Sequence, residues 1–170
     1  MCMATLGIND GSYAKLFSVM VEQQLGHVRV HHQDYPGKRV MFDTIADASS
    51  TLGTIDALEG TVAAAPRLNG YALIGAGDAS AGGQLIGVDP ARDEVVTSLA
   101  GRVIEGSYLD ETQHGQALIG SGLAKELEVG PGGEIVVVTQ SADGSMGNAL
   151  YSVAGVFKTG NTSMDRSGVY

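Results

Sequence analysis

The pattern of hydrophobic and polar positions is most regular between Gln116 and Lys158. Ala117–Ile119 form a short apolar run, which predicts a strand. The apolar residues Leu123, Ala124 and Leu127 then follow at the spacing of one helix face. This stretch therefore predicts a strand that leads directly into a short helix.

The same stretch continues with two further strands. Ser121 can cap the helix, and Gly130–Pro131 can end it. The four consecutive β-branched residues Ile135–Val138 predict a strand buried on both faces. Polar Ser141–Asn148 predict a turn or loop, and the alternation over Tyr151–Val156 predicts a last strand.

The N-terminal part predicts a helix and then a strand. Asn9 or Asp10 can cap a helix that runs to about Leu25 and carries one apolar stripe. This helix either covers the core or forms the aqueous end of a longer membrane helix, with residues 1–8 as its stub. His27–Gln33 alternate in polarity, which predicts a strand. The stripe consists of Tyr13, Leu16, Phe17, Met20 and Val21.

The middle of the chain predicts short elements separated by turns. Ser49 or Ser50 can cap a helix through Leu58. Asn69-Gly70 is a strong turn signal. We expect Tyr71–Ile74 and Gln84–Val88 to form a hairpin around the loop GAGDASAGG.

A further helix is predicted by several signals at its start. Asp89 is a cap, Pro90 stands at the first helical position, and acidic side chains fill the first turn. This helix is expected to end near Gly101. Together with the 25 glycines, many beside short strands, the pattern predicts an α+β fold, a mixed or antiparallel β-rich domain with a few short helices.

The charge of the chain argues against nucleic acid as a partner. The formal net charge is −9, and residues 41–170 hold sixteen acidic and six basic side chains. An acidic body repels phosphate, and no basic patch with interleaved aromatic residues offsets that repulsion. Cys2 is the single cysteine, so neither an intrachain disulfide nor a cysteine-based metal site is expected. No secretory signal and no apolar run of membrane-spanning length is present.

Three histidines within six residues raise the question of a zinc site. His27 and His31 would lie about 13 Å apart in a strand, too far for one ion, and His32 would face the other side. We therefore expect an ordinary polar strand face there, and the same holds for His114 in a polar turn. No metal site is predicted.

Two other motifs resemble catalytic or cofactor signatures. The segment beginning at Gly75 lacks the third glycine of a dinucleotide fingerprint, and a strand rather than a helix follows it. Ser12 and Lys15 form S-x-x-K, and Lys158-Thr159-Gly160 forms K-T-G, as in penicillin-recognising enzymes. The third element of that set is missing. Gly120-Ser121-Gly122 also lacks the nucleophile elbow. No catalytic and no cofactor-binding residue is predicted, and no cofactor.

The order of motifs along the chain resembles a known family. The motifs in order are Leu25-Gly26-His27, Val28–His32, Ala65–Leu68, Leu85–Pro90, Glu105–Leu109, Ala117–Gly120, Gly133–Val138 and Val153–Phe157 with Thr159-Gly160 and Asp165. Together they resemble the extracytoplasmic core domain of FtsX-like ABC transporter permeases, of the MacB and lipoprotein-releasing (Lol) type. The Gly-His-Val-x-Val-His start is more similar to the lipoprotein-releasing permeases than to the efflux permeases.

The resemblance implies a function and a place in the cell. It implies that residues 1–26 are a membrane-proximal helix continuing a first membrane helix, and that residues 27–170 are a periplasmic core domain, truncated at its C-terminal end. It implies a non-catalytic domain on the periplasmic side of the inner membrane that couples ATP-driven helix movement to extracytoplasmic work. The favoured form of that work is lipoprotein release. The alternatives are a MacB-type efflux domain and a free-standing soluble α+β binding module.

The partners that the resemblance implies are an ABC ATPase subunit, which would carry out ATP hydrolysis, and a second permease subunit. A lipoprotein or a periplasmic chaperone or adaptor is a further expected partner. No functional residue of the family can be carried over, because the region that contacts the lipoprotein chaperone has no clear counterpart here. We therefore assign no site residues from the resemblance.

Overall fold

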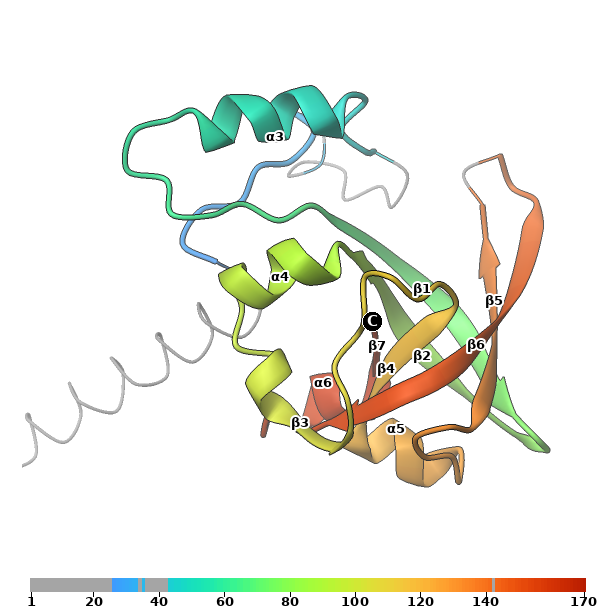
Figure 1. Cartoon of the computed structure of the whole chain (residues 1–170). Helices are drawn as coiled ribbons and strands as arrows, with labels where there is room; N and C mark the ends of the chain where they lie inside the picture. The colour runs from blue at the N-terminus through green and yellow to red at the C-terminus, as the bar shows by residue number, and fades with distance from the viewer. Residues whose placement is uncertain (1–25, 34, 36–42, 142) are drawn as a thin grey trace, which may run out of the picture.

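A computed structural model describes residues 26–33, 35, 43–141 and 143–170. Within them, short helices alternate with seven strands, as Figure 1 shows. The predicted helix between Asp10 and Leu25, and with it the predicted membrane-proximal segment, lies outside the described residues. The elements in chain order are α3 (Ala48–Asp56), β1 (Arg67–Ala76), β2 (Ala79–Val88), α4 (Pro90–Val96), the 3-10 helix η2 (Ala100–Arg102), β3 (Val103–Gly106), β4 (Gln116–Gly120), α5 (Ser121–Glu126), β5 (Glu134–Gln140), β6 (Met146–Phe157), α6 (Thr162–Ser167) and β7 (Gly168–Val169).

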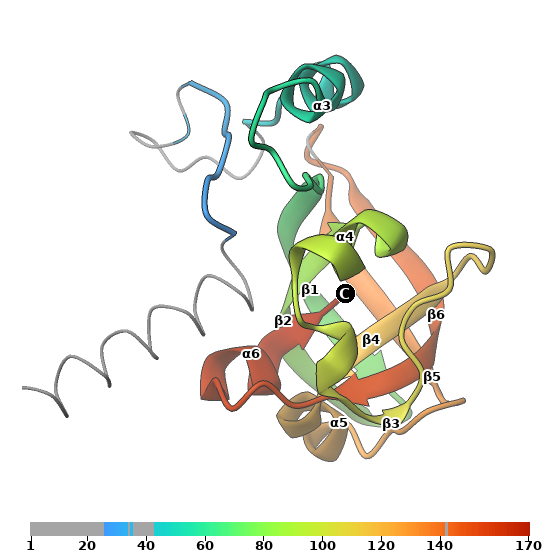
Figure 2. The ribbon, with the colours of Figure 1, turned by 60° about the vertical axis from the view of Figure 1, so that its left-hand side comes forward.

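The strands form one mixed sheet that closes on itself. The order is β3-β6-β4-β7-β2-β1-β5, and β5 also pairs with β6. The pairings from β6 through β4, β7, β2, β1 and β5 back to β6 therefore make a complete ring, a small barrel that both ribbon views show (Figures 1 and 2). β4 runs parallel to β6 and β7 runs parallel to β2, whereas the other pairs are antiparallel. The predicted α+β class with a mixed sheet is confirmed.

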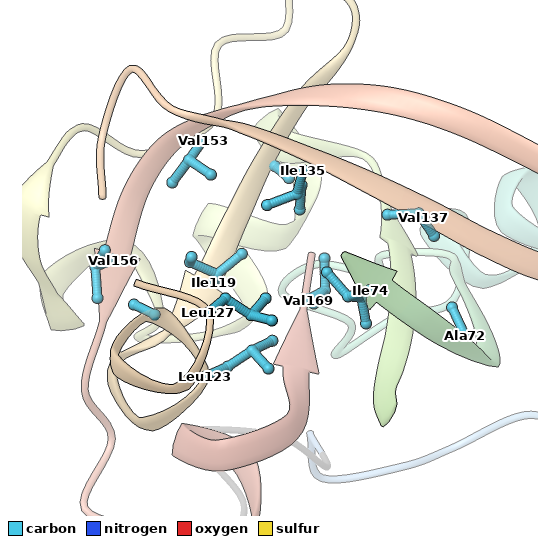
Figure 3. Packing of buried hydrophobic residues seen from close by; sticks show 12 residues of the cluster. Ala72, Ile74, Ile119, Leu123, Leu127, Ile135, Val137, Val153, Val156 and Val169 are labelled. Atoms are coloured by element: carbon cyan, nitrogen blue, oxygen red, sulfur yellow. The ribbon is translucent and has the colours of Figure 1, made fainter. Parts of the chain in front are cut away.

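The inside of the barrel is the main hydrophobic core. Inward-facing side chains of β1, β4, β5 and β6 meet those of α5, which closes one end of the barrel (Figure 3). The predicted apolar positions Leu123, Ala124 and Leu127 all lie in this core. Its buried residues are Ala72, Ile74, Ala117, Ile119, Leu123, Ala124, Leu127, Ile135, Val137, Val153, Val156 and Val169.

A second core lies on the outer face of the sheet. There Leu118 of β4 and Phe157 of β6 pack with Leu99, which precedes η2, and with Met164 of α6. Ile86 of β2 and the terminal Tyr170 complete this cluster. β4 is therefore covered on both faces, which explains why Ala117, Leu118 and Ile119 are all buried.

Strand β6 changes its inward face at a bulge. Ala117 pairs with Val153, but the next residue, Leu118, pairs with Gly155, so Ala154 is an extra residue. Before the bulge Val153 faces the barrel interior, and after it Val156 does so. The simple alternation predicted over Tyr151–Val156 therefore fails at Ala154.

Two predictions about β1 and its neighbours were wrong. Asn69-Gly70 lies inside β1, where it pairs with Ile86 and Leu85 of β2, rather than in a turn. The expected nine-residue loop is also mostly strand, since Ala76 already pairs with Ala79 and only Gly77 and Asp78 make the turn. A ten-residue ladder on both strands outweighs the local turn preference of an Asn-Gly pair. The hairpin itself is confirmed.

The strand predicted over His27–Gln33 is absent. These residues have no strand assignment, and the side chains of Val28 and Val30 are 82% and 52% exposed. A strand needs a neighbouring strand for its hydrogen bonds, and among the described residues no strand pairs with this segment. Alternating polarity was therefore an insufficient signal here.

Burial and capping correct three further predictions. Val136 is exposed on the outer face while Ile135 and Val137 are buried, so β5 is not buried on both faces. Ser121 is the first helical residue rather than the cap, because Gly120 holds that position without a side-chain bond. The helix α3 begins at Ala48, with Asp47 as its cap.

Asp89 caps α4 as predicted, through a bond from the backbone N–H of Arg92. However, α4 ends at Val96 rather than near Gly101. Thr97 adopts an extended conformation and its hydroxyl donates to Asp93 instead of allowing another helical turn. The chain then forms the separate helix η2.

Candidate functional site

The histidine-rich segment shows no arrangement suited to a metal. His31 stacks on Tyr35 with ring centroids 4.8 Å apart, which occupies the face of the imidazole. Within the described residues, no three His, Cys, Asp or Glu side chains gather closely enough to hold a metal ion. His114 lies elsewhere, at the rim of a cleft described below.

The K-T-G motif is part of a loop closed by Asp165. The backbone N–H and the hydroxyl of Thr159 each donate to Asp165 Oδ1 at 2.8 Å, and the N–H of Gly160 donates to Oδ2 at 3.1 Å. Gly160 has a φ of +83°, a conformation that favours glycine. The motif thus stabilises the start of α6, where Asn161 is the cap. Ser12 and Lys15, the other half of the enzyme-like pattern, lie outside the described residues.

The segment beginning at Gly75 is the β1–β2 turn. Gly77 has a φ of +54°, and β2 follows immediately at Ala79. No helix start is available there to receive a phosphate, because a strand rather than a helix follows the glycines.

A buried carboxylate organises the side of the barrel near α4. Asp93 on α4 is completely buried and receives two bonds from Arg67, at 2.8 Å from Nε and 2.6 Å from Nη2 to Oδ1. Its Oδ2 accepts from the hydroxyl of Thr97 at 3.0 Å and from that of Tyr108 at 3.2 Å. Since a buried charge is costly unless it is paired and hydrogen-bonded, this network joins β1, α4 and the segment after β3 into one unit.

Two tyrosines at this network have raised pKa values. Burial, followed by the nearby Asp93 carboxylate, raises the pKa of Tyr108 far above its usual range. Burial also raises the pKa of Tyr170 to about 12, against a smaller opposing effect of the Arg67 charge. Arg67 lies over the ring of Tyr170, with Cζ 5.9 Å from the centroid, and Phe157 meets that ring edge-on at 5.6 Å. The Tyr170 hydroxyl is buried and has no hydrogen-bond partner in the described part of the chain.

A wide cleft opens at the end of the barrel opposite α5. Its volume is about 1250 Å³, and it is open to solvent. Its walls come from the start of β1, the end of β2, the start of α4, the segment before β4, and the tip of the β5–β6 hairpin. The floor includes Tyr151, Val169 and Tyr170. The cleft is therefore bordered by both cores, since Val169 belongs to the barrel core and Tyr170 to the second core.

Charges around the cleft are largely engaged with neighbours. Arg92 forms an ion pair with Asp56 of α3 at 3.1 Å and also donates to the carbonyl of Ala64. Asp110 accepts from the hydroxyl and N–H of Thr112, and these bonds lower its pKa. Arg92 and Asp110 are therefore held by neighbouring groups, and Glu111 and His114 also line the cleft.

The central residues of this region were not identified from the sequence. Asp93 appeared only as an acid in the first turn of a helix, and Arg67 and Tyr108 appeared only as members of the motifs Ala65–Leu68 and Glu105–Leu109, with no role assigned to them. A salt bridge across 26 positions is set by how α4 folds back on β1. The one usable hint was the Asp89-Pro90 helix start, which places Asp93 one turn later.

Comparisons with known proteins agree on the type of domain. The family model described as MacB-like periplasmic core domain matches residues 1–170. A solved structure, the extracellular domain of the noncanonic ABC-type transporter YknZ from Gram-positive bacteria, is similar with a TM-score of 0.51 and 13% sequence identity. That similarity covers 65% of this chain and 56% of the YknZ chain, so this chain spans little more than half of its length. No curated protein matches.

At 13% identity, the YknZ similarity speaks for the fold alone. None of the described helices has the length and apolar character needed to cross a membrane. The family model, in contrast, covers the whole sequence, in agreement with the resemblance carried by the ordered motifs. The chain belongs to the MacB-like periplasmic core domain family, the periplasmic part of an ABC-type transporter permease.

Proposed function

We propose that this domain couples ATP-driven movement of membrane helices to work outside the cytoplasmic membrane, and that this work is lipoprotein release. The observation that carries the proposal is the family match over residues 1–170. The preference for lipoprotein release over efflux is supported by the Gly-His-Val-x-Val-His sequence at residues 26–31.

The proposed partners follow from the same argument. An ABC ATPase subunit supplies the energy, and a second permease subunit completes the membrane part. A lipoprotein, or a periplasmic chaperone or adaptor that receives it, contacts the domain on the periplasmic side of the inner membrane. The compact barrel transmits force well, because its two cores and the Arg67–Asp93 pair leave few ways to deform it.

The first test examines the genes and coding sequence on either side of this chain's own coding sequence. Sequencing outward from both ends is expected to reveal an apolar span before residue 9, further domain and three spans after residue 170, and a neighbouring ATPase gene. A natural start at Met1, a stop after Tyr170 and no transporter gene nearby would contradict the transport function and favour a free-standing binding module.

A functional test then separates release from efflux. The complete permease is reconstituted with its ATPase in liposomes that carry a fluorescent lipoprotein, and release is followed after ATP is added. A variant in which a Gly-Ser linker replaces residues 27–170 is expected to retain ATP hydrolysis but lose release. An ATPase-inactive complex is the control. ATP-dependent export of soluble compounds without lipoprotein release would overturn the lipoprotein assignment.

A further inference from the structure

Exposed apolar side chains gather on the outer face of one side of the barrel. Tyr71 and Leu73 of β1, Val136 of β5 and Leu150 of β6 are all exposed. They lie on one face, because Leu73 pairs with Val138, and Val136 pairs with Leu150. The residues next to them on β1 and β5 point into the barrel core. We call the surface formed by Tyr71, Leu73, Val136, Val138 and Leu150 the apolar wall.

The apolar wall lies across the barrel from β7. Around the ring, β5 is separated from β7 by β1 and β2 on one side and by β6 and β4 on the other. The pairings that build the wall are therefore independent of β7. The principal helix contacts in the described part of the chain go to β2, β4, β6 and β7, and none of them to β1 or β5. The wall is thus an apolar sheet face without a covering layer among the described elements.

The backbone of the wall leaves no place for an added strand at β1 or β5. β5 pairs with β1 on one side and with β6 on the other, and β1 also pairs with β2. A partner must therefore contact the wall through side chains, as a helix does when it covers a sheet. From Tyr71 to Gly75 the wall is about 13 Å long, and its three strands are about 10 Å wide. These dimensions match about nine residues of an α-helix.

Two glycines keep the sheet flat beside the large side chains of the wall. Gly82 of β2 pairs with Leu73, and Gly75 of β1 pairs with Val136. A Cβ added at Gly82 would have no atom within 4 Å, and at Gly75 the nearest would be the carbonyl oxygen of Ala79, at 3.8 Å. Neither glycine has a positive φ, so neither conformation nor packing requires it. Glycine within a strand marks places where another backbone approaches closely.

The charge beside the wall is negative. The four strands β1, β2, β5 and β6 carry only two charged residues, Arg67 and Glu134, and Arg67 is paired with the buried Asp93. Where β1 ends and β5 begins, Asp78, Glu128 and Glu134 line one hollow of about 550 Å³. Among the described residues, none of these three carboxylates takes part in an ion pair. This end of the wall therefore attracts a cation.

Charge complementarity selects the class of partner. A second copy of this chain would bring its own carboxylates to the wall in either face-to-face orientation, because the hairpin tip at the opposite end carries Asp143. An anionic lipid surface is repelled for the same reason. A helix with an apolar stripe and lysine or arginine beside it satisfies both the wall and the hollow. Lys125, three residues before Glu128, is offset by its neighbour Glu126.

We propose that the apolar wall docks a basic amphipathic helix of a partner protein. The apolar stripe of that helix packs on Leu73, Val136 and Leu150, and a lysine or arginine beside the stripe enters the hollow at Glu134. The inference goes beyond the proposed function and does not depend on it. A failed docking test therefore leaves the proposed function standing, and the reverse also holds.

The first experiment measures peptide binding to the 170-residue chain by fluorescence anisotropy. The probe is a synthetic helix of about five turns, made of leucine in one stripe and lysine elsewhere. One control has glutamate in place of lysine, and the other has the same leucines and lysines in scrambled order. Since the scrambled peptide keeps the charge, it measures nonspecific attraction to an acidic protein. Both controls are expected to bind about tenfold more weakly, and binding of the probe is expected to weaken as salt is raised.

Two variants of the protein test the wall and the hollow separately. Leu73→Ser removes an apolar contact, and Glu134→Lys reverses a charge. Each is expected to weaken binding of the probe about tenfold. The matched controls are Val95→Ser and Glu94→Lys on α4, where both side chains are also exposed, and they are expected to leave binding unchanged. Melting temperatures are measured for all four, and Glu134→Lys tests the site even if Leu73→Ser fails to fold.

Methyl resonances locate the bound helix. Those of Leu73, Val136 and Leu150 are expected to shift when the probe is added. Shifts confined to other residues would overturn the proposal, as would equal binding of the scrambled peptide or wild-type binding by both wall variants.

Two further measurements identify other occupants of the wall. A dimer in sedimentation that Leu73→Ser abolishes would show that a second copy covers the wall, and would overturn the partner helix. In the complete gene product, Leu73→Cys in a Cys2→Ser background is expected to react with a polar maleimide. Protection of that cysteine without any partner would show that the protein's own chain covers the wall, and would also overturn the proposal.

Discussion

At the scale of single residues, Asp93 is the side chain that holds the buried hydrogen-bond network together. It accepts bonds from Arg67, Thr97 and Tyr108 with no exposure to solvent. Asp93→Asn removes the charge that Arg67 requires, and breaking a buried ion pair costs about 3 kcal/mol of unfolding free energy. Urea denaturation should show this loss.

The control for that experiment is a second ion pair of the described residues, which is exposed to solvent. Asp56 and Arg92 are 39% and 41% exposed, and pairs in water contribute little. We expect Asp56→Asn to leave the urea midpoint at its wild-type value. Equal effects of the two variants would contradict the central role of Asp93.

Tyr170 is the second residue whose environment makes a prediction. Its hydroxyl is buried without a partner among the described residues, so Tyr170→Phe removes an unsatisfied group and keeps the ring against Phe157 and Arg67. We expect a gain of about 1 kcal/mol in stability at neutral pH. A calorimetric melting temperature below that of the wild type would show that the hydroxyl has a partner in solution.

The pH dependence of the same residue gives an independent measurement. The pKa of Tyr170 rises from 10.0 to about 12 in the folded state. Its protonated form is therefore favoured by folding, and this contribution is complete below pH 10 and is lost as the pH rises toward 12. The wild type should lose stability across that window, and Tyr170→Phe should lose less.

At the scale of elements, backbone packing between β4–α5 and α6 depends on Gly120. A Cβ at Gly120 would lie 2.4 Å from the carbonyl oxygen of Asp165 and 2.8 Å from that of Met164. Because both neighbours are backbone, Gly120→Ala should cost about 1–3 kcal/mol or more. The measurement is the urea midpoint.

Gly70→Ala is the matched comparison on β1. Nothing lies within 4 Å of its Cβ position, and its φ is not positive. The variant should be neutral or up to about 1 kcal/mol more stable, since alanine restricts the unfolded chain. If Gly70→Ala were as damaging as Gly120→Ala, the open space at the Cβ position of Gly70 would be wrong.

At the scale of the whole molecule, stability is distributed unevenly. α3 has no buried residue, and its described link to the barrel is the exposed pair of Asp56 with Arg92. β4 is buried on both faces and pairs with β6 and β7. Hydrogen exchange should therefore be at least a hundredfold faster in α3 than in β4, because α3 can open without exposing core. Equal protection of the amides in the two elements would indicate that another part of the protein covers α3.

The parts of the fold that could be predicted from the sequence are those that rest on contacts between residues close together in the chain. The β4–α5 unit, the β1–β2 hairpin and the Asp89 cap needed only local periodicity or capping chemistry. The ends of β1 and β2 were misplaced, because a long ladder overrode the Asn69-Gly70 signal. At the candidate site the sequence predicted no residue, since Arg67 and Asp93 meet only through the return of α4 onto β1.

What the sequence by itself determined is the class of domain, the family and most element types, because these follow from periodicity and from motif order. The tertiary structure alone decided that the strands close into a ring and that Asp93 is buried. Closure and burial depend on contacts between residues distant in the chain. Such contacts follow from how the whole chain packs, so no local window of sequence contains them.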